Sequence, residues 1–191
     1  MLFCASCLLF ACSANASWKT MPSDVRVDVA RSTMSVAPAG NWNRWSSRPT
    51  MKGEIWTRDG VLLNELSFVA QLQNGETLYA ELDPQNAPLP RFRKDMLPIE
   101  LAEWVEESNR IVLQTTIFDV DRVEPALLGG HDAVRFSYRY VAGTDQLERS
   151  GEAVAAVIDG KFFMVNFVAA STYYFDRDIA DVRALVDSVK I

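Results

Sequence analysis

Hydrophobic and polar positions alternate along much of the chain, with the two-residue period of a half-buried β-strand. Near the start, Val25, Val27 and Val29 alternate with polar residues, and a second short segment covers 34–36. We expect further strands at 53–58, 61–69, 77–82, 111–120, 134–140, 147–158 and 161–170. The pattern therefore predicts a domain built mainly from strands.

Turn residues separate several of these runs. Asp59-Gly60 and Asp159-Gly160 each stand between two apolar runs. Such pairs are typical of two-residue hairpins, because a type I′ turn needs positive φ at both positions. The run after the second turn, 161–170, is apolar on both faces. We expect it to be the central strand of a sheet that is covered on both sides.

Two helices are predicted, one in the middle of the chain and one at its end. Residues 83–98 contain four prolines, which indicates a long loop, and a helix should begin at Pro98. The expected buried face of that helix is Leu97, Leu101, Trp104, Val105 and Ser108. Asp176 is the expected N-cap of the last helix, whose buried stripe is Ile179, Val182, Val186 and Val189. This order of elements predicts an α+β fold, an antiparallel β-sheet flanked by helices.

Several short segments of the chain resemble the Mog1/PsbP-like superfamily and its small bacterial envelope lipoproteins. They are PAGNW at 38–42, GGHDAVRF at 129–136, DGKFF at 159–163 and the closing helix at 175–191. The resemblance covers about residues 18–191. It implies a layered fold with helices beside an antiparallel sheet, a place in the cell envelope, and a binding or accessory role. The superfamily shares no catalytic residues, so the resemblance implies none here.

The first residues of the chain predict a leader. All three cysteines, Cys4, Cys7 and Cys12, lie within the first twelve residues, and 2–11 are uncharged and mostly apolar. A helix over that stretch would span about 15 Å, half of a bilayer core, which is too short to cross a membrane. The length matches the h-region of a signal peptide, although the basic n-region is missing. We expect 1–17 to be a leader and 18–191 a single α+β domain.

Two processing routes are open for this leader. The segment LFAC at 9–12 resembles a bacterial lipobox, in which cleavage before Cys12 leaves a diacylglycerol on its thiol. The segment ANA at 14–16 is an A-x-A site, and cleavage after Ala16 would release a soluble periplasmic protein. We expect the first route, which places the protein in a bacterial cell envelope, anchored by lipid and facing the periplasm.

The charge balance limits the partners. The chain has 19 Lys and Arg against 25 Asp and Glu, a formal net charge of -6. Binding to phosphates needs a basic footprint, so we expect no nucleic-acid partner. An acidic domain is also not drawn to anionic lipid headgroups, so contact with a membrane would come from the lipid at Cys12.

Aromatic residues interleaved with arginines mark a candidate binding surface, because such side chains are enriched where proteins bind partners. One group lies at 42–45 and another in the proline-rich loop at 91–93. The expected surface residues are Trp42, Arg44, Trp45, Arg91, Phe92 and Arg93. In the alternative interpretation, Trp42 belongs to the core and Trp45 is partly exposed.

Residues that could carry chemistry are few. His131 is the only histidine, and a catalytic site would also need a nucleophile and an oxyanion site; the sequence has no G-x-S-x-G motif and no cysteine after Cys12. Asp119 and Asp121 lack the glycine and the closing glutamate of a calcium loop. We expect no catalytic residue, metal or cofactor, and a non-enzymatic accessory protein that binds a ligand or an envelope protein. The alternatives are a secreted hydrolase or metal-dependent enzyme that uses His131, and a soluble periplasmic assembly factor.

Overall fold

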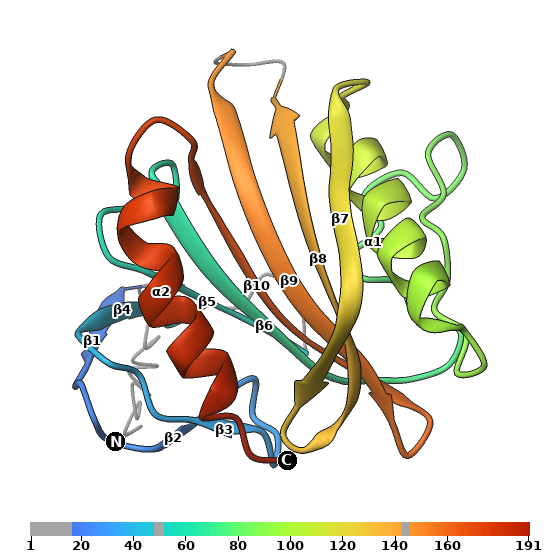
Figure 1. Cartoon of the computed structure of the whole chain (residues 1–191). Coiled ribbons are helices and arrows are strands. Elements are labelled where there is room, and N and C mark those ends of the chain that lie inside the picture. Colours follow the sequence, from blue (N-terminus) through green and yellow to red (C-terminus); the bar gives the residue numbers. More distant parts are fainter. Residues whose placement is uncertain (1–16, 48–51, 143–145) are drawn as a thin grey trace, which may run out of the picture.

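An antiparallel β-sheet forms the frame of the protein (Figure 1). The computed structural model describes residues 17–47, 52–142 and 146–191, and in these residues eight strands form one sheet in the order β1-β4-β5-β6-β10-β9-β8-β7. A separate pair, β2 and β3, forms a small ribbon. The strands are β1 Trp18–Met21, β2 Val27–Asp28, β3 Ser35–Val36, β4 Trp42–Trp45, β5 Gly53–Thr57, β6 Asn64–Leu72, β7 Phe118–Leu128, β8 His131–Val141, β9 Glu148–Ile158 and β10 Lys161–Ala170.

Helices α1 (Pro98–Leu113) and α2 (Tyr174–Asp187) cover opposite faces of the sheet (Figure 1). Each face buries its own hydrophobic cluster. Strand β10 contributes to both, because Phe163, Val165 and Phe167 pack under α2 while Phe162 and Met164 pack under α1. The predicted α+β class, the flanked antiparallel sheet and the central place of this strand are therefore confirmed.

Two tight hairpins follow the turn chemistry of the sequence. Gly129-Gly130 joins β7 to β8, and Asp159-Gly160 joins β9 to β10. All four residues have positive φ, at 59°, 85°, 50° and 71° in chain order. These are the backbone conformations that a type I′ turn requires.

The other expected hairpin, at Asp59-Gly60, is wrong in its details. Strand β5 ends at Thr57 and β6 begins only at Asn64, so Val61 belongs to a longer turn and not to a strand. The side chain of Asn64 explains the difference, because its Oδ1 accepts hydrogen bonds from the backbone N–H groups of Arg58 and Asp59 at 2.9 and 3.2 Å. An asparagine that binds nearby backbone in this way competes with the strand ladder.

Other boundaries also differ from the sequence prediction. Residues 111–113 continue α1, which ends where Gln114 takes a left-handed conformation with φ of 50°. A short apolar run of this kind fits a helix as well as a strand. The expected strand at 77–82 is reduced to one bridge between Thr77 and Arg91. Strands β1 and β4 have no counterpart in the prediction.

The predicted start of α1 at Pro98 is confirmed, but one residue near each helix start needs correction. Leu97 was expected on the buried face of α1, but it precedes the helix and is 62% exposed, while its N–H donates to Glu100 Oε2 at 2.6 Å. The residue before α2 is Tyr173, so Asp176 lies in the first turn and is not the N-cap. An acidic residue is favourable there because it faces the positive end of the helix dipole.

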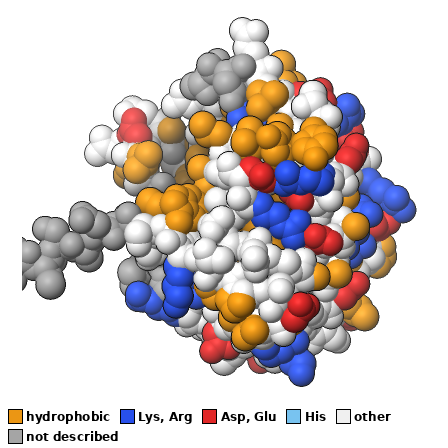
Figure 2. Space-filling model, turned by 90° about the vertical axis from the view of Figure 1, so that its left-hand side faces the viewer, with side chains coloured by type: hydrophobic (Ala, Val, Ile, Leu, Met, Phe, Trp, Pro, Cys, Tyr) orange, Lys and Arg blue, Asp and Glu red, His pale blue; other side chains and the backbone are white. Residues whose placement is uncertain are grey.

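A buried carboxylate, Asp178, holds α2 against the β5–β6 hairpin. It pairs with Arg58 Nη1 at 2.8 Å and with Arg177 Nη2 at 2.7 Å, and Asn64 Nδ2 donates to it at 3.2 Å. The guanidinium of Arg58 also lies 4.5 Å from the ring centroid of Trp42. A carboxylate that is 1% exposed needs such partners to offset its lost hydration. Figure 2 shows this side of the molecule, where acidic and basic side chains lie beside one another.

Tyr138 on β8 crosses β9 because its neighbour there has no side chain. It pairs with Gly151 in the antiparallel register, and a Cβ on Gly151 would overlap the tyrosine ring. The ring can therefore reach β10, where its hydroxyl donates to Asn166 Oδ1 at 2.7 Å. Phe118 stacks on the same ring, with 4.8 Å between the centroids.

We expect Gly151→Ala to lower the free energy of unfolding by about 1–3 kcal/mol, because the added methyl group forces the Tyr138 ring to move. Urea unfolding of the purified protein measures this loss. In a Tyr138→Ala background the ring is gone, so the same substitution should cost much less, which a double-mutant cycle detects. Equal losses in both backgrounds would contradict the close contact.

Candidate functional site

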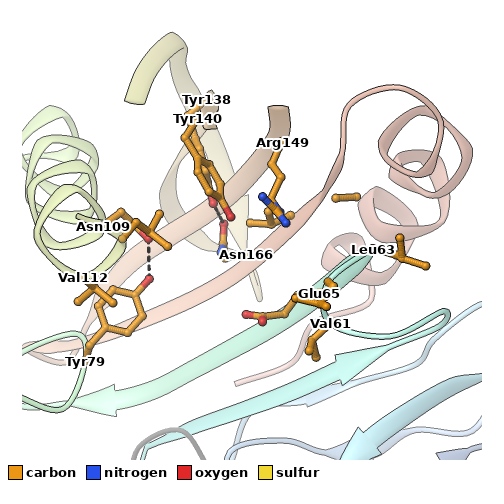
Figure 3. Close-up of a pocket in the computed structure, with 14 residues that line it drawn as sticks. Val61, Leu63, Glu65, Tyr79, Asn109, Val112, Tyr138, Tyr140, Arg149 and Asn166 are labelled. Atoms are coloured by element: carbon orange, nitrogen blue, oxygen red, sulfur yellow. Dashed lines mark hydrogen bonds between the residues drawn. The ribbon is translucent and has the colours of Figure 1, made fainter. Parts of the chain in front are cut away.

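A cavity of about 160 Å³ opens on the α1 face of the sheet, at the end where β6 begins (Figure 3). We call it the α1 cavity. Its walls come from the last turns of α1, from strands β6, β8, β9 and β10, and from the turn before β6. Its lining residues are Val61, Leu62, Leu63, Glu65, Tyr79, Asn109, Val112, Leu113, Tyr138, Tyr140, Arg149, Asn166, Val168 and Ala169.

Two tyrosine–asparagine pairs form the polar wall of the α1 cavity. Tyr79 donates its hydroxyl proton to Asn109 Oδ1 on α1 at 2.8 Å, as the dashed line in Figure 3 shows. Tyr138 donates in the same way to Asn166 Oδ1 on β10 at 2.7 Å. Both asparagines are buried, at 8% and 7% exposure, so these bonds satisfy amide groups that water hardly reaches.

Glu65 on β6 points its carboxyl group into the α1 cavity (Figure 3). It is half-buried, and among the described residues it has no hydrogen-bond or ion-pair partner. Loss of water around it raises its pKa to about 7. Burial also raises the pKa of Tyr79 and Tyr138, and the negative charge of Glu65 adds to both shifts. The carboxyl group therefore lies within electrostatic reach of both hydroxyls.

The mouth of the α1 cavity is apolar and exposed. Val61 and Leu62 in the turn before β6 are 41% and 73% exposed, and Val112 on α1 is 46% exposed. Inside, Arg149 on β9 is buried and donates from Nη1 to the carbonyl of Leu147 at 3.2 Å. The arrangement is that of a small binding site, with an apolar entrance and a few convergent polar groups.

A second cavity, of about 290 Å³, lies on the α2 face, but its charges are already matched. Arg139 binds Asp121 with two hydrogen bonds of 2.9 Å. Arg183 binds Glu152 in the same two-pronged way, at 3.0 and 2.6 Å, and Arg135 Nε lies 3.6 Å from that carboxylate. A ligand there would have to break these pairs, so the α1 cavity is the better candidate.

The expected binding surface at 42–45 is partly wrong. Trp42 is 1% exposed and packs in the cluster under α2, so it offers no surface to a partner. Arg44 pairs with the buried Glu54 at 3.1 Å. Trp45 is half-buried and lies at the sheet edge against Trp18, with 4.6 Å between ring centroids.

The expected surface in the proline-rich loop also contains both buried and exposed residues. Phe92 is fully buried and packs between Trp104 and Phe162, which fixes the loop to the cluster under α1. Its neighbours Arg91 and Arg93 stay exposed and pair with acidic residues. Phe92 and Trp42 lie in clusters on opposite faces of the sheet, so the six residues do not form one surface.

The remaining candidate residues lie apart from the α1 cavity. His131 is exposed at the first position of β8, beside the exposed Asp132. Among the described residues, no group of three His, Cys, Asp or Glu side chains could hold a metal ion. In that part of the chain no helix has both the length and the apolar character to span a membrane. Cys12 and its leader, up to Ala16, lie outside the described residues.

Sequence reasoning misses the α1 cavity because its residues are far apart along the chain. Glu65, Tyr79, Asn109, Tyr138 and Asn166 span about a hundred positions, and only the sheet and α1 bring them together. One local signal was available. A glutamate between Asn64 and Leu66 interrupts an apolar run, which is where a carboxyl group becomes half-buried.

Comparison with known proteins identifies the fold. No family model and no curated protein matches the chain. Among solved structures, the cyanobacterial PsbP protein CyanoP from Synechocystis is similar over 98% of both chains, with 15% identity and a TM-score of 0.55. The fold is PsbP-like. The resemblance predicted from the sequence is thereby confirmed for the fold.

Two further solved structures are more distant from this PsbP-like chain. A crystal structure from Bacteroides thetaiotaomicron shares 9% identity and a TM-score of 0.48; the match covers 82% of this chain and only 44% of the other. LpqN of Mycobacterium tuberculosis, which is involved in cell envelope biogenesis, shares 11% identity and a TM-score of 0.35 over 93% of this chain and 86% of its own.

We expect the stability of the protein to depend on pH through Glu65. Its pKa is about 7 in the folded state and 4.5 in the unfolded chain, so its contribution to stability is fully present below pH 4.5 and is lost as pH rises through 7. Glu65→Gln should therefore raise the free energy of unfolding above pH 7, by roughly 1–3 kcal/mol, and change it little at pH 4.5.

Urea unfolding between pH 4.5 and pH 8 measures this difference. Glu107→Gln, at an exposed position on α1, is the matched control and should leave the pH dependence of the wild type unchanged. Parallel pH curves for wild type and Glu65→Gln would contradict the placement of Glu65 in a water-poor site.

Proposed function

We propose that the protein is a non-enzymatic accessory protein of a bacterial cell envelope, and that it binds a small chemical group in the α1 cavity. The observation that carries the proposal is the convergence of Glu65 and two tyrosine–asparagine pairs behind an apolar entrance. Binding sites combine these features, a few positioned polar groups within an apolar wall. The PsbP-like fold provides the frame for this site, and the site itself supports the function.

The size of the α1 cavity limits what it can bind. Its volume of about 160 Å³ is below the roughly 300 Å³ at which pockets for drug-sized ligands begin. The cavity therefore suits one functional group, either on a small molecule or on a side chain of a partner protein. The exposed Val61, Leu62 and Val112 would contact whatever carries that group.

The proposed location in the cell envelope is based on the leader sequence. An apolar stretch at 2–11, whose last three residues belong to LFAC at 9–12, supports export and a diacylglycerol on Cys12. The domain would then lie on the periplasmic side of a membrane, held by the lipid. A net charge of -6 argues against a nucleic-acid partner.

The lipid anchor is tested by expressing the full chain in a bacterial host and fractionating the cells. We expect wild-type protein in the membrane fraction with a lipid-modified Cys12, as shown by intact mass of the detergent-extracted protein. Cys12→Ala should lose both the lipid and the membrane association, and Cys7→Ala is the matched control that should keep them. A mature protein that begins at Ser17 without lipid would overturn the anchor.

The binding role is tested by capture from envelope extracts with a variant that blocks the cavity mouth. Leu62→Arg places a charged side chain at the entrance, where Leu62 is 73% exposed, so folding should be unaffected. We expect species that the wild type enriches to be lost with Leu62→Arg. Leu127→Arg, at a position that is 62% exposed on β7, should retain them. Equal capture by all three proteins would overturn the role of the α1 cavity.

A further inference from the structure

The hydrogen bonds around the α1 cavity decide what kind of group it can accept. Asn109 Nδ2 donates to the carbonyl of Val105 at 2.8 Å, which orients the amide so that its Oδ1 faces Tyr79. The single hydroxyl proton of Tyr79 is therefore committed to that oxygen. What Tyr79 can still offer to a ligand is the lone pairs of its own oxygen.

The second pair leads to the same result. Asn166 Nδ2 lies 3.4 Å from Ser67 Oγ, which turns the amide oxygen toward Tyr138. The Tyr138 hydroxyl donates its hydrogen bond to that oxygen at 2.7 Å, so only the lone pairs of the hydroxyl oxygen remain, as acceptors. The buried Tyr138 on β8 and the half-buried Tyr79 in the loop before α1 thus present hydroxyl acceptors, and no free hydroxyl donor, to the cavity.

Glu65 adds a negative charge beside the two tyrosine hydroxyl acceptors. Its carboxylate accepts hydrogen bonds only, and it faces the same space as Tyr79 and Tyr138 (Figure 3). A half-buried carboxylate without a partner is unfavourable, and a cation that donates hydrogen bonds would relieve this cost. An alkylammonium group carries three N–H donors and one positive charge, which matches two hydroxyl oxygens and one carboxylate.

We propose that the α1 cavity binds a primary ammonium group at the end of an aliphatic chain. This inference rests on the proposed binding function and names the chemistry of its ligand. The apolar mouth formed by Val61, Leu62 and Val112 suits the methylene groups of such a chain, as apolar surface suits the stem of a lysine side chain. The ammonium group comes from a free amine or from a lysine side chain of a partner.

The cavity wall carries two further titratable side chains, Arg149 and Tyr140. Arg149 lies on β9, two strands away from Glu65 on β6, and β10 separates them. Its guanidinium donates to the carbonyl of Leu147. Tyr140, the third tyrosine on the wall, contributes a hydroxyl beside that of Tyr138 (Figure 3).

The test is a titration of the purified full chain with n-butylammonium chloride, followed by ¹H–¹⁵N chemical shifts at constant ionic strength. We expect saturable shifts at residues of the α1 cavity. Glu65→Gln should weaken binding at least tenfold, and Tyr79→Phe, which removes one acceptor, several-fold. Glu124→Gln, a half-buried carboxylate on β7, is the matched control and should bind like the wild type. Thermal melting of each variant shows that it is folded.

The pH dependence gives a second measurement on the same protein. Binding needs the ionised form of Glu65, whose pKa is about 7, so the dissociation constant should rise about tenfold per pH unit below 7. Tyr79, Tyr138 and Arg149 do not change charge in that range, because burial raises the pKa of both tyrosines and guanidinium groups stay protonated.

Probes of different chemistry separate the possible outcomes. If Nα-acetyl-lysine methylamide binds more tightly than butylammonium, the ligand is a lysine side chain of a partner. If butylammonium binds more tightly, the ligand is a free amine. Both results support the proposal. Butyrate or butanol binding as tightly as butylammonium, or equal binding by Glu65→Gln, would overturn the ammonium ligand. The ammonium ligand can fail in this way while Leu62→Arg still abolishes capture from envelope extracts. In that case the proposed binding function stands, but its ligand is not an ammonium group.

Discussion

Strand β10 is the element on which the packing of both faces of the sheet depends. It lies between β6 and β9, and its side chains enter the hydrophobic clusters on both faces of the sheet. Burial of a large apolar side chain stabilises by about 1.5–3 kcal/mol. Phe163 and Phe167 contribute this to the layer under α2, and Phe162 contributes it to the layer under α1. Helices α1 and α2 do not touch one another through the sheet, and each packs against side chains that this strand positions.

A polar position within this strand gives the protein its cavity. Asn166 follows Met164 on the α1 face of β10, where apolar residues would otherwise continue the core. Its amide is satisfied by Tyr138, which crosses β9 over Gly151 to reach it. The core under α1 therefore ends where the polar network begins. Gly151 leaves the space that the Tyr138 ring needs, and Asn166 provides the amide that its hydroxyl binds, so the hydrogen bond depends on both residues.

Local chemistry accounts for what the sequence predicts well. The turn at 159–160 depends on two residues, and the central strand depends on a mostly apolar run of ten, so short stretches of sequence are enough to predict them. Alternation and helical spacing then lead to the α+β class. The position where α1 ends is harder to predict, because the apolar residues 111–113 suit a helix and a strand equally.

The candidate site could not be predicted in the same way. Aromatic residues next to arginines, as at Trp42 and Phe92, look alike in sequence whether they are exposed or buried, and the structure buries both. The α1 cavity depends on strand order, which places β6, β8 and β10 near the end of α1 although their residues are distant along the chain. Strand order depends on which elements pack together, and no single segment carries that information.

The turn between β5 and β6 serves both faces of the sheet at once. Asn64 and Asp59 connect it to α2 through Asp178 and Arg177, while Val61 and Glu65, a few residues away, form part of the cavity beside α1. Six residues of backbone thus link a helix anchor on one side to a binding site on the other. A displacement of this turn by an occupant of the cavity would be transmitted to the ion pairs of the opposite helix, so the two layers are mechanically joined at this hairpin.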